Sequence, residues 1–195
     1  MCYLYVVQII NIVGIMKVKS FIIVLAGFLA FNFGCSNQPK AVENQDVDEI
    51  QLAAEGFVND YVDILSAEQK DALELRLEAL DDSTGNQIAV AIVNEFEGDN
   101  ILDFATRLGK QWGVGQKDKN NGVMIVVKVK TDDSNGQVAI AVGTGIEDII
   151  PSATCQNIID REMVPHFKEN DYYSGINAAI DAIIPIVTGN LSSCK

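Results

Sequence analysis

QIAVAIV at residues 87–93 and VMIVVKV at residues 123–129 are the two stretches that decide the fold of this chain. Both are almost wholly apolar and rich in β-branched residues, which is typical of central strands covered on both faces. The region between them carries the apolar stripe of a helix, formed by Ile101, Phe104, Ala105, Leu108 and Trp112. A strand–helix–strand unit places its strands parallel through a right-handed crossover. We therefore expect an α/β domain built around these two strands.

Further elements flank this unit on both sides. A capping box at Ser66 indicates the start of a preceding helix. A turn with the hairpin signal Asn135-Gly136 leads to a third strand at residues 137–142, which is expected to run antiparallel. Two more helices are predicted at about residues 152–163 and 174–187. Helices on both faces of a small mixed sheet would give a three-layer α/β/α sandwich.

The N-terminal region has the features of an export signal. Residues 1–34 contain no Asp or Glu, and a basic start is followed by an apolar run at residues 21–33. A helix of that length reaches only about 20 Å, less than the roughly 30 Å of bilayer hydrocarbon, which favours a cleaved signal over a permanent span. Gly34-Cys35 then predicts cleavage before Cys35 and a diacylglycerol on its thiol, although Asn32 and Phe33 depart from the usual lipoprotein pattern. An ordinary secreted protein or an uncleaved anchor is the alternative.

The chain is expected to divide into four parts. They are a signal segment at residues 1–34 with Met16 as the expected true start, a lipid-anchored flexible tether at 35–56, an α/β domain at 57–188 and a short tail at 189–195. The net charge is −13, and loss of the signal would remove two lysines and no acid, leaving −15. Such a domain repels nucleic acid and anionic lipid surfaces, and it attracts cations, although acidity also serves solubility alone. We expect it in the cell envelope, outside the cytoplasm, with envelope proteins as partners.

The cysteine and histidine content limits the chemistry. Beyond Cys35 and the N-terminal Cys2 the chain has only Cys155 and Cys194, and its single histidine is His166. This composition excludes Cys/His zinc clusters and catalysis through two histidines. In an oxidising envelope Cys155 and Cys194 are expected to form a disulfide.

A series of short motifs runs in order through the expected domain. They are Val58-Asn59-Asp60, Thr84-Gly85-Asn86-Gln87-Ile88, Trp112-Gly113-Val114-Gly115, Asn121-Gly122-Val123, Val142-Gly143-Thr144-Gly145-Ile146-Glu147 and Pro165-His166-Phe167. In order and spacing they resemble the TPM-domain family, small exported or membrane-tethered domains of bacteria and plant thylakoids. The resemblance implies an α/β/α sandwich and a link to divalent cations in some relatives; plant relatives are assigned acid phosphatase activity. One departure is Asn120, which stands where an Asp is frequent in the family.

Two glycine-flanked loops form the candidate site. The loop at residues 116–122 enters the second strand and the loop at 143–148 leaves the antiparallel third strand, so both are expected at one end of the sheet. Their oxygen-bearing side chains suit Ca²⁺ or Mg²⁺ rather than zinc. Asp60 would join them if residues 57–65 crossed this edge. The predicted metal ligands are Asp60, Asp118, Asn121, Glu147 and Asp148. Alternatively, glycines make these turns and Asn and Asp merely fill them.

Three classes of function follow from these observations. The first is a divalent-cation-binding interaction or scaffolding module of the cell envelope, which we favour because no pairing of nucleophile and base is visible. The second is a metal-assisted acid phosphatase acting on phosphoesters through Asp60, Asp118 or Glu147. The third is a purely structural lipoprotein. No nucleotide cofactor is expected, because Gly143-Thr144-Gly145 lacks the remainder of a dinucleotide-binding fingerprint.

Overall fold

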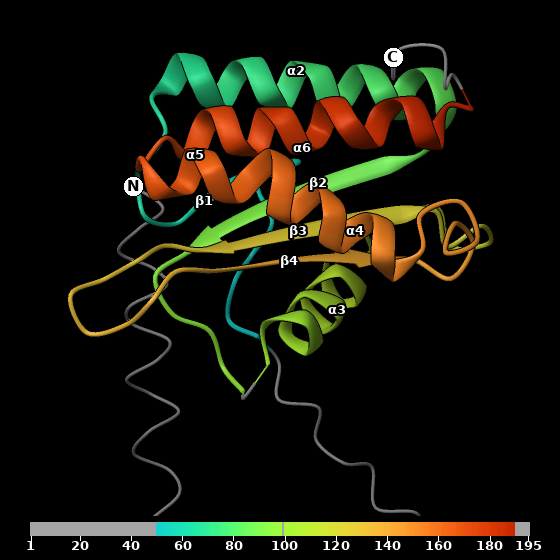
Figure 1. Cartoon of the computed structure of the whole chain (residues 1–195). Helices are drawn as coiled ribbons and strands as arrows, with labels where there is room; N and C mark the ends of the chain where they lie inside the picture. The colour runs from blue at the N-terminus through green and yellow to red at the C-terminus, as the bar shows by residue number, and fades with distance from the viewer. Residues whose placement is uncertain (1–49, 99, 190–195) are drawn as a thin grey trace, which may run out of the picture. The chain divides into compact units, whose positions relative to one another are not determined.

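The computed structural model describes residues 50–98 and 100–189 (Figure 1). The elements follow one another as β1 (Val58–Asp60), α2 (Ala67–Thr84), β2 (Gln87–Val93), α3 (Ile101–Trp112), β3 (Gly122–Lys128), β4 (Gln137–Val142), α4 (Ser152–Ile158), the π-helical turn η1 (Ile159–Met163), α5 (Val164–Lys168) and α6 (Tyr172–Val187). Helices cover both faces of the sheet, with α3 on one face and the other helices on the opposite face (Figure 1). The predicted three-layer α/β/α sandwich is confirmed.

The sheet has the order β1-β2-β3-β4. β2 and β3 pair in parallel, with Val90 opposite Ile125, and β3 and β4 pair antiparallel, with Ile125 opposite Ile140. These orientations confirm the crossover and the hairpin. The strand β1 is additional to the three predicted strands, and it pairs in parallel with β2. Its three residues are too few to show a strand periodicity in the sequence.

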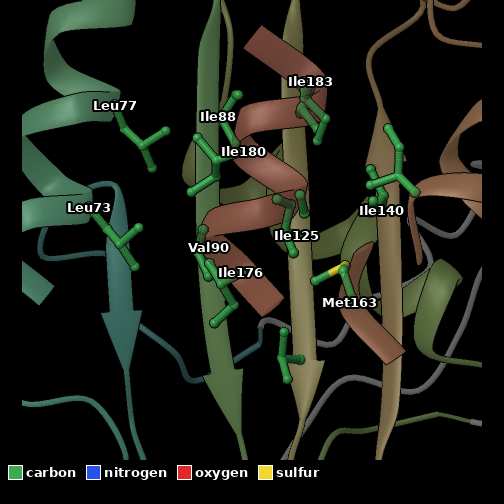
Figure 2. Packing of buried hydrophobic residues seen from close by; sticks show 14 of the residues in the cluster. Leu73, Leu77, Ile88, Val90, Ile125, Ile140, Met163, Ile176, Ile180 and Ile183 are labelled. Atoms are coloured by element: carbon green, nitrogen blue, oxygen red, sulfur yellow. The ribbon is translucent and has the colours of Figure 1, made fainter. Parts of the chain in front are cut away.

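Two apolar clusters hold the layers together, one on each face of the sheet. The larger lies between the sheet and the α2, η1 and α6 helices, where Leu77, Ile125 and Ile180 are fully buried (Figure 2). The smaller lies under α3, around Phe104 and Leu108. β2 and β3 contribute to both clusters because alternate side chains point to opposite faces. This explains why their sequences are apolar without alternation.

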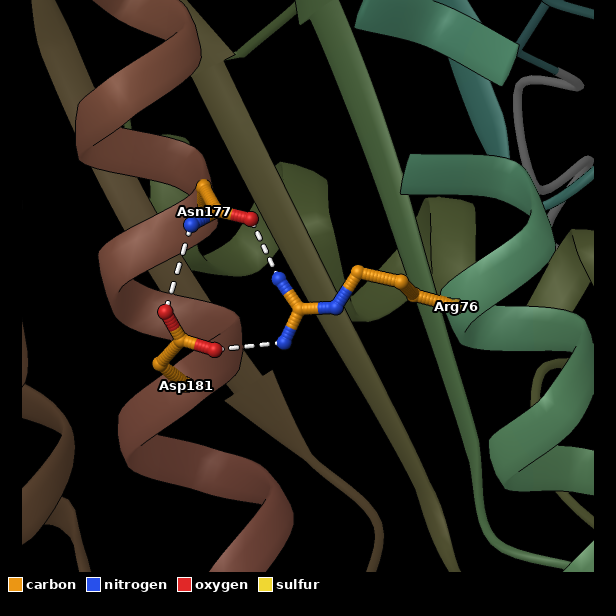
Figure 3. A network of polar contacts seen from close by, with 3 residues as sticks. All are labelled: Arg76, Asn177 and Asp181. Carbon is orange, nitrogen blue, oxygen red and sulfur yellow. Dashed lines mark hydrogen bonds and ion pairs between the residues drawn. The ribbon is translucent and has the colours of Figure 1, made fainter. Parts of the chain in front are cut away.

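A polar network joins α2 to α6 on the surface of the larger layer. The Arg76 guanidinium donates to Asn177 and to Asp181, and the Asn177 amide donates to Asp181 (Figure 3). Arg76 and Asp181 also form an ion pair in which both side chains are partly exposed. An exposed pair of this kind contributes about 1 kcal/mol or less. The network therefore sets the register of two helices that apolar packing already holds.

Residues from the end of the expected tether pack against the domain. Ile50 is buried under α3, its N–H donates to the Gln111 side chain at 2.9 Å, and its carbonyl accepts from Gln111 at 2.6 Å. The Trp112 indole donates to the Leu52 carbonyl at 2.8 Å. The expected boundary at residue 57 stays a prediction, and this segment makes two specific contacts with the end of α3 that its composition does not indicate.

The helix expected at residues 152–163 also continues further, through Pro165 to Lys168. The π-helical turn η1 precedes Pro165, which occupies the start of α5, where its missing N–H is not needed. None of the helices in the described ranges is long and apolar enough to span a bilayer. The signal segment, Cys35 and the predicted tail from residue 190 lie outside the described residues.

Candidate functional site

The two glycine-flanked loops meet at one end of the sheet, as their strand polarity predicts. The Gly143 N–H donates to the Gly122 carbonyl at 2.8 Å, and the Gly145 N–H donates to the Asn120 carbonyl at 3.1 Å. A Cβ atom at Gly143 would overlap the carbonyl of Asn120, and one at Gly145 would overlap that of Lys119. The glycines thus allow the two backbones to lie in direct contact. We call this region the loop end of the sheet.

Asn121 fixes the first loop from inside. It is 4% exposed, its Oδ1 accepts from the Gln116 N–H at 2.8 Å, and its Nδ2 donates to the Gly85 carbonyl at 2.8 Å and to Asn86 Oδ1 at 2.9 Å. These bonds tie the loop to the segment between α2 and β2. The amide of Asn121 is thus buried and bonded within the protein, and its role as a metal ligand stays a prediction.

A pocket of about 560 Å³ lies between these loops and the C-terminal half of α3. Its lining includes small residues of α3, β3 and β4, among them Gly109, Gly122 and Ala141. Lys110, Lys117 and Glu147 are the charged residues that line it. The pocket is therefore lined by side chains of both charges and by small residues.

The predicted acidic ligands have different positions relative to this pocket. Glu147 lines it. Asp118 lies in the exposed turn of the first loop, and Asp148 follows Glu147 in the exposed turn of the second. Within the described residues no three Asp, Glu, His or Cys side chains come close enough together to hold a metal ion by themselves.

Asp60 does not belong to the loop end. It is the last residue of β1, opposite Ile92, which lies near the carboxyl end of β2. The loop end adjoins the amino ends of β2 and β3, so Asp60 lies at the opposite end of the sheet. Its carboxylate instead accepts from the N–H groups of Val62 at 3.0 Å and Leu65 at 2.8 Å. The condition on which Asp60 would have joined the site is not met.

The donor set at the pocket fits a divalent cation only in part. Glu147 supplies one carboxylate, and the turns beside it carry backbone carbonyls and the Thr144 hydroxyl. An all-protein calcium cage needs six to eight oxygen ligands, whereas Mg²⁺ commonly takes one or two carboxylates and completes its shell with water and ligand oxygens. The residues present therefore fit a cation that is shared with water or a bound ligand.

Sequence reasoning did not place the two lysines in the site. Lys117 lies in the first loop, and Lys110 lies on the helix that precedes this loop. Lys110 follows Thr106 by one helical turn, and both residues line the pocket. That spacing on α3, together with the Gly113 stop that turns the chain towards β3, is the signal that could have indicated them.

The histidine and cysteine lie away from this pocket. His166 is on α5 and does not line the pocket, which agrees with a packing or surface role. Cys155 is buried on α4, and desolvation raises the pKa of its thiol. A thiol with a raised pKa is a weak nucleophile at neutral pH.

Taken together, the fold and loop end describe a small α/β/α domain with a pocket beside a mixed sheet. The family model of the TPM domain matches residues 58–186. The chain belongs to the TPM-domain family. No curated protein matches the sequence.

Solved structures agree with this assignment. The N-terminal domain of a protein from P. gingivalis is 29% identical, with a TM-score of 0.59, and the match covers 69% of this chain and 83% of that one. The BA42 protein from the psychrophilic bacterium Bizionia argentinensis is 17% identical, with a TM-score of 0.53 and coverage of 67% and 86%. The N-terminal domain of cg2496 from Corynebacterium glutamicum is 14% identical, with a TM-score of 0.51 and coverage of 84% and 91%. The latter two show the fold alone.

Proposed function

We propose that this TPM domain is a divalent-cation-binding interaction module of the cell envelope that takes its ligand in the loop-end pocket. The observation that carries the proposal is the pair of hydrogen-bonded loops, which holds the Glu147 carboxylate beside a pocket of about 560 Å³. Binding at a rigid rim costs little conformational entropy, because the loops are already ordered by their own hydrogen bonds. The module is held at a membrane by a lipid on Cys35.

A cation at this rim would connect the domain to an oxygen-bearing group of the partner. With one carboxylate from the protein, the coordination shell has room for a carboxylate or phosphate oxygen from outside. Lys110 and Lys117, which line the same pocket, would stabilise this anionic group electrostatically. The account therefore predicts that cation and anionic ligand each strengthen the binding of the other.

The two lysines also favour a second candidate, a metal-assisted phosphatase. Glu147 would hold the cation, which would supply Lewis-acid chemistry when bound, while Lys110 and Lys117 would hold the phosphate oxygens. Hydrolysis of p-nitrophenyl phosphate with Mg²⁺ tests this candidate. If hydrolysis occurs and is lost both in Glu147→Gln and in the presence of chelator, the domain is a metal-assisted phosphatase and not an interaction module.

Thermal melting of the chain from Cys35 onward, with and without Ca²⁺ and Mg²⁺, tests the cation proposal. Binding to the native state alone stabilises by about 2.7 kcal/mol at a hundredfold excess over Kd, and chelator should reverse the effect. Glu147→Gln should weaken the response, whereas Asp132→Ala, in the exposed turn at the other end of β3, should not. Equal melting temperatures for the unmodified protein in both cations and in chelator would contradict cation binding. The purely structural lipoprotein would then be the remaining class of function.

A further inference from the structure

The outer edge of β4 is an unpaired strand edge. The Gly143 N–H bonds to Gly122, so the antiparallel alternation turns the N–H and C=O groups of Val138, Ile140 and Val142 away from β3. The order β1-β2-β3-β4 places no strand beyond β4 within the described part of the chain. Three residues with outward amides and carbonyls are sufficient to pair with an added strand.

The two edges of this sheet are protected to very different degrees. β1 has three residues, ends in Asp60, and is bordered by residues 53–55, where Tyr61 donates to the Ala53 carbonyl and the Glu55 N–H donates to Asn59. β4 is QVAIAV, with neither a charge nor a proline in its six residues. Folded proteins guard exposed edges with short strands, charges or proline because a free edge pairs with other chains. The β4 edge carries none of these guards and is open to pairing with an added strand.

A groove of about 530 Å³ follows this edge between α3 and α4. Its α3 wall includes Leu102, which is 46% exposed, and its α4 wall includes Cys155 and Gln156. A groove with a strand edge at its base and helix side chains on its walls matches the geometry of β-strand addition, in which backbone pairing gives affinity and flanking pockets receive alternate side chains.

We propose that this groove binds an extended, basic peptide segment of a partner protein, which adds to β4 as a fifth strand. Charge selects this occupant. Glu147 is the only charged side chain lining the groove, and Asp160, which accepts from Gln156 at 3.0 Å, borders it. A second copy of this chain would bring its own net charge of −13 to the same surface. Glu147 also lines the loop-end pocket, so a cation bound there would compete with the basic peptide for this carboxylate.

An amide NMR titration of the chain from Cys35 onward tests this proposal. The probe is a blocked synthetic peptide of the same length as β4, in which valine alternates with lysine, and the comparison peptide carries glutamate in place of lysine. The basic peptide should shift the amides of Val138, Ile140 and Val142 at concentrations up to about 1 mM, the range of a weak single-strand contact. The acidic peptide should shift them much less.

Two pairs of variants assign the effect to the backbone edge and the groove wall. Val138→Pro removes one outward N–H and leaves the bonds to β3, whereas Val138→Ala shortens the side chain and keeps the amide. Binding should be lost in the first and kept in the second. Leu102→Lys should weaken binding of the basic peptide by about threefold through like charge, whereas Leu75→Lys, on an exposed residue of α2, should leave it unchanged.

Three results would overturn the proposal. One is the absence of shifts at the β4 amides with either peptide. Another is a concentration dependence of these amides without peptide, which would make a second copy the occupant. In the last, the peptide shifts the β4 amides only after residues 190–195 have been removed. The occupant of the groove would then be the chain's own tail.

Discussion

Asn121 holds the loop end together through three hydrogen bonds from a side chain that is 4% exposed. Asn121→Ala would leave the Gly85 carbonyl and the Gln116 N–H without these partners. Unsatisfied buried groups cost about 1–3 kcal/mol each, so we expect the free energy of unfolding in urea to fall by about 2 kcal/mol or more. The loss should be equal with Ca²⁺ and with chelator. A loss of unfolding free energy that appears only in Ca²⁺ would show that Asn121 is a ligand.

Asp171 is the N-cap of α6, and its carboxylate accepts from the Ser174 N–H at 3.0 Å. Hydrogen bonds from the side chain and backbone of Ser174 lower the pKa of this carboxyl group. Because the folded-state pKa is depressed, the stability from the cap is fully present above the usual carboxyl pKa of about 4 and is lost as the pH falls through the lower folded-state pKa.

Melting curves at pH 7 and pH 3 check this prediction. Asp171→Ala should lower the melting temperature at pH 7, and the difference from the unmodified protein should shrink at pH 3. Asp133→Ala, in the exposed turn between β3 and β4, provides the control. A deficit of the same size at both pH values would show that the charge of Asp171 does not stabilise α6.

At the scale of the elements, the sequence was informative where patterns are long. The continuous apolar runs at β2 and β3, the helical period of the α3 stripe and the Asn135-Gly136 turn are local patterns. Together they predict the strand directions and the positions of both loops. β1 was missed because three residues carry no period. The contact of Ile50 with Gln111 was missed because a pairing between positions so far apart in the chain leaves no local signal.

The sequence likewise predicted only some features of the candidate site. The sequence determines the strand polarity, and strand polarity predicts that the two loops meet. The hydrogen bonds between the loops confirm that they do. The position of Asp60 depended on where a short segment joins the sheet, and β1 places it at the other end. The presence of Lys110 and Glu147 in one pocket depends on how α3 packs against β4, which no local pattern specifies.

The predicted disulfide would join α4 to the segment that follows α6 in the sequence. Cys155 lies in α4, which starts beside the loop end, and α6 returns to the same end, where the Val187 carbonyl accepts from Asn86. Cys194 lies outside the described residues. The bond would close a loop of about 40 residues and add about 3–4 kcal/mol in the chain-entropy model.

Thiol labelling of denatured protein from the envelope measures this bond. We expect labelling of Cys155 and Cys194 only after reduction, with a lower melting temperature in reductant. Because burial raises the pKa of the Cys155 thiol, labelling of native protein would be slow in either redox state, and denaturation is needed. Two labelled thiols before reduction would contradict the prediction.

At the scale of the whole molecule, the apolar run at residues 21–33 and Gly34-Cys35 predict export and lipidation. Intact-mass analysis of membrane-extracted protein should give a chain that starts at an acylated Cys35. Cys35→Ser should release the domain or leave the signal uncut. A mature N-terminus elsewhere, without lipid, would refute the anchor and leave an ordinary secreted domain.

The central claim is that the loop end binds a divalent cation, and a residue-resolved titration tests it most directly. Amide NMR spectra of the chain from Cys35 onward are recorded during addition of Ca²⁺ and then Mg²⁺. We predict saturable shifts confined to residues 116–122 and 143–148, reversed by chelator and weakened in Glu147→Gln. Unchanged spectra for these loops at millimolar cation, or shifts spread over all acidic surfaces, would contradict the account.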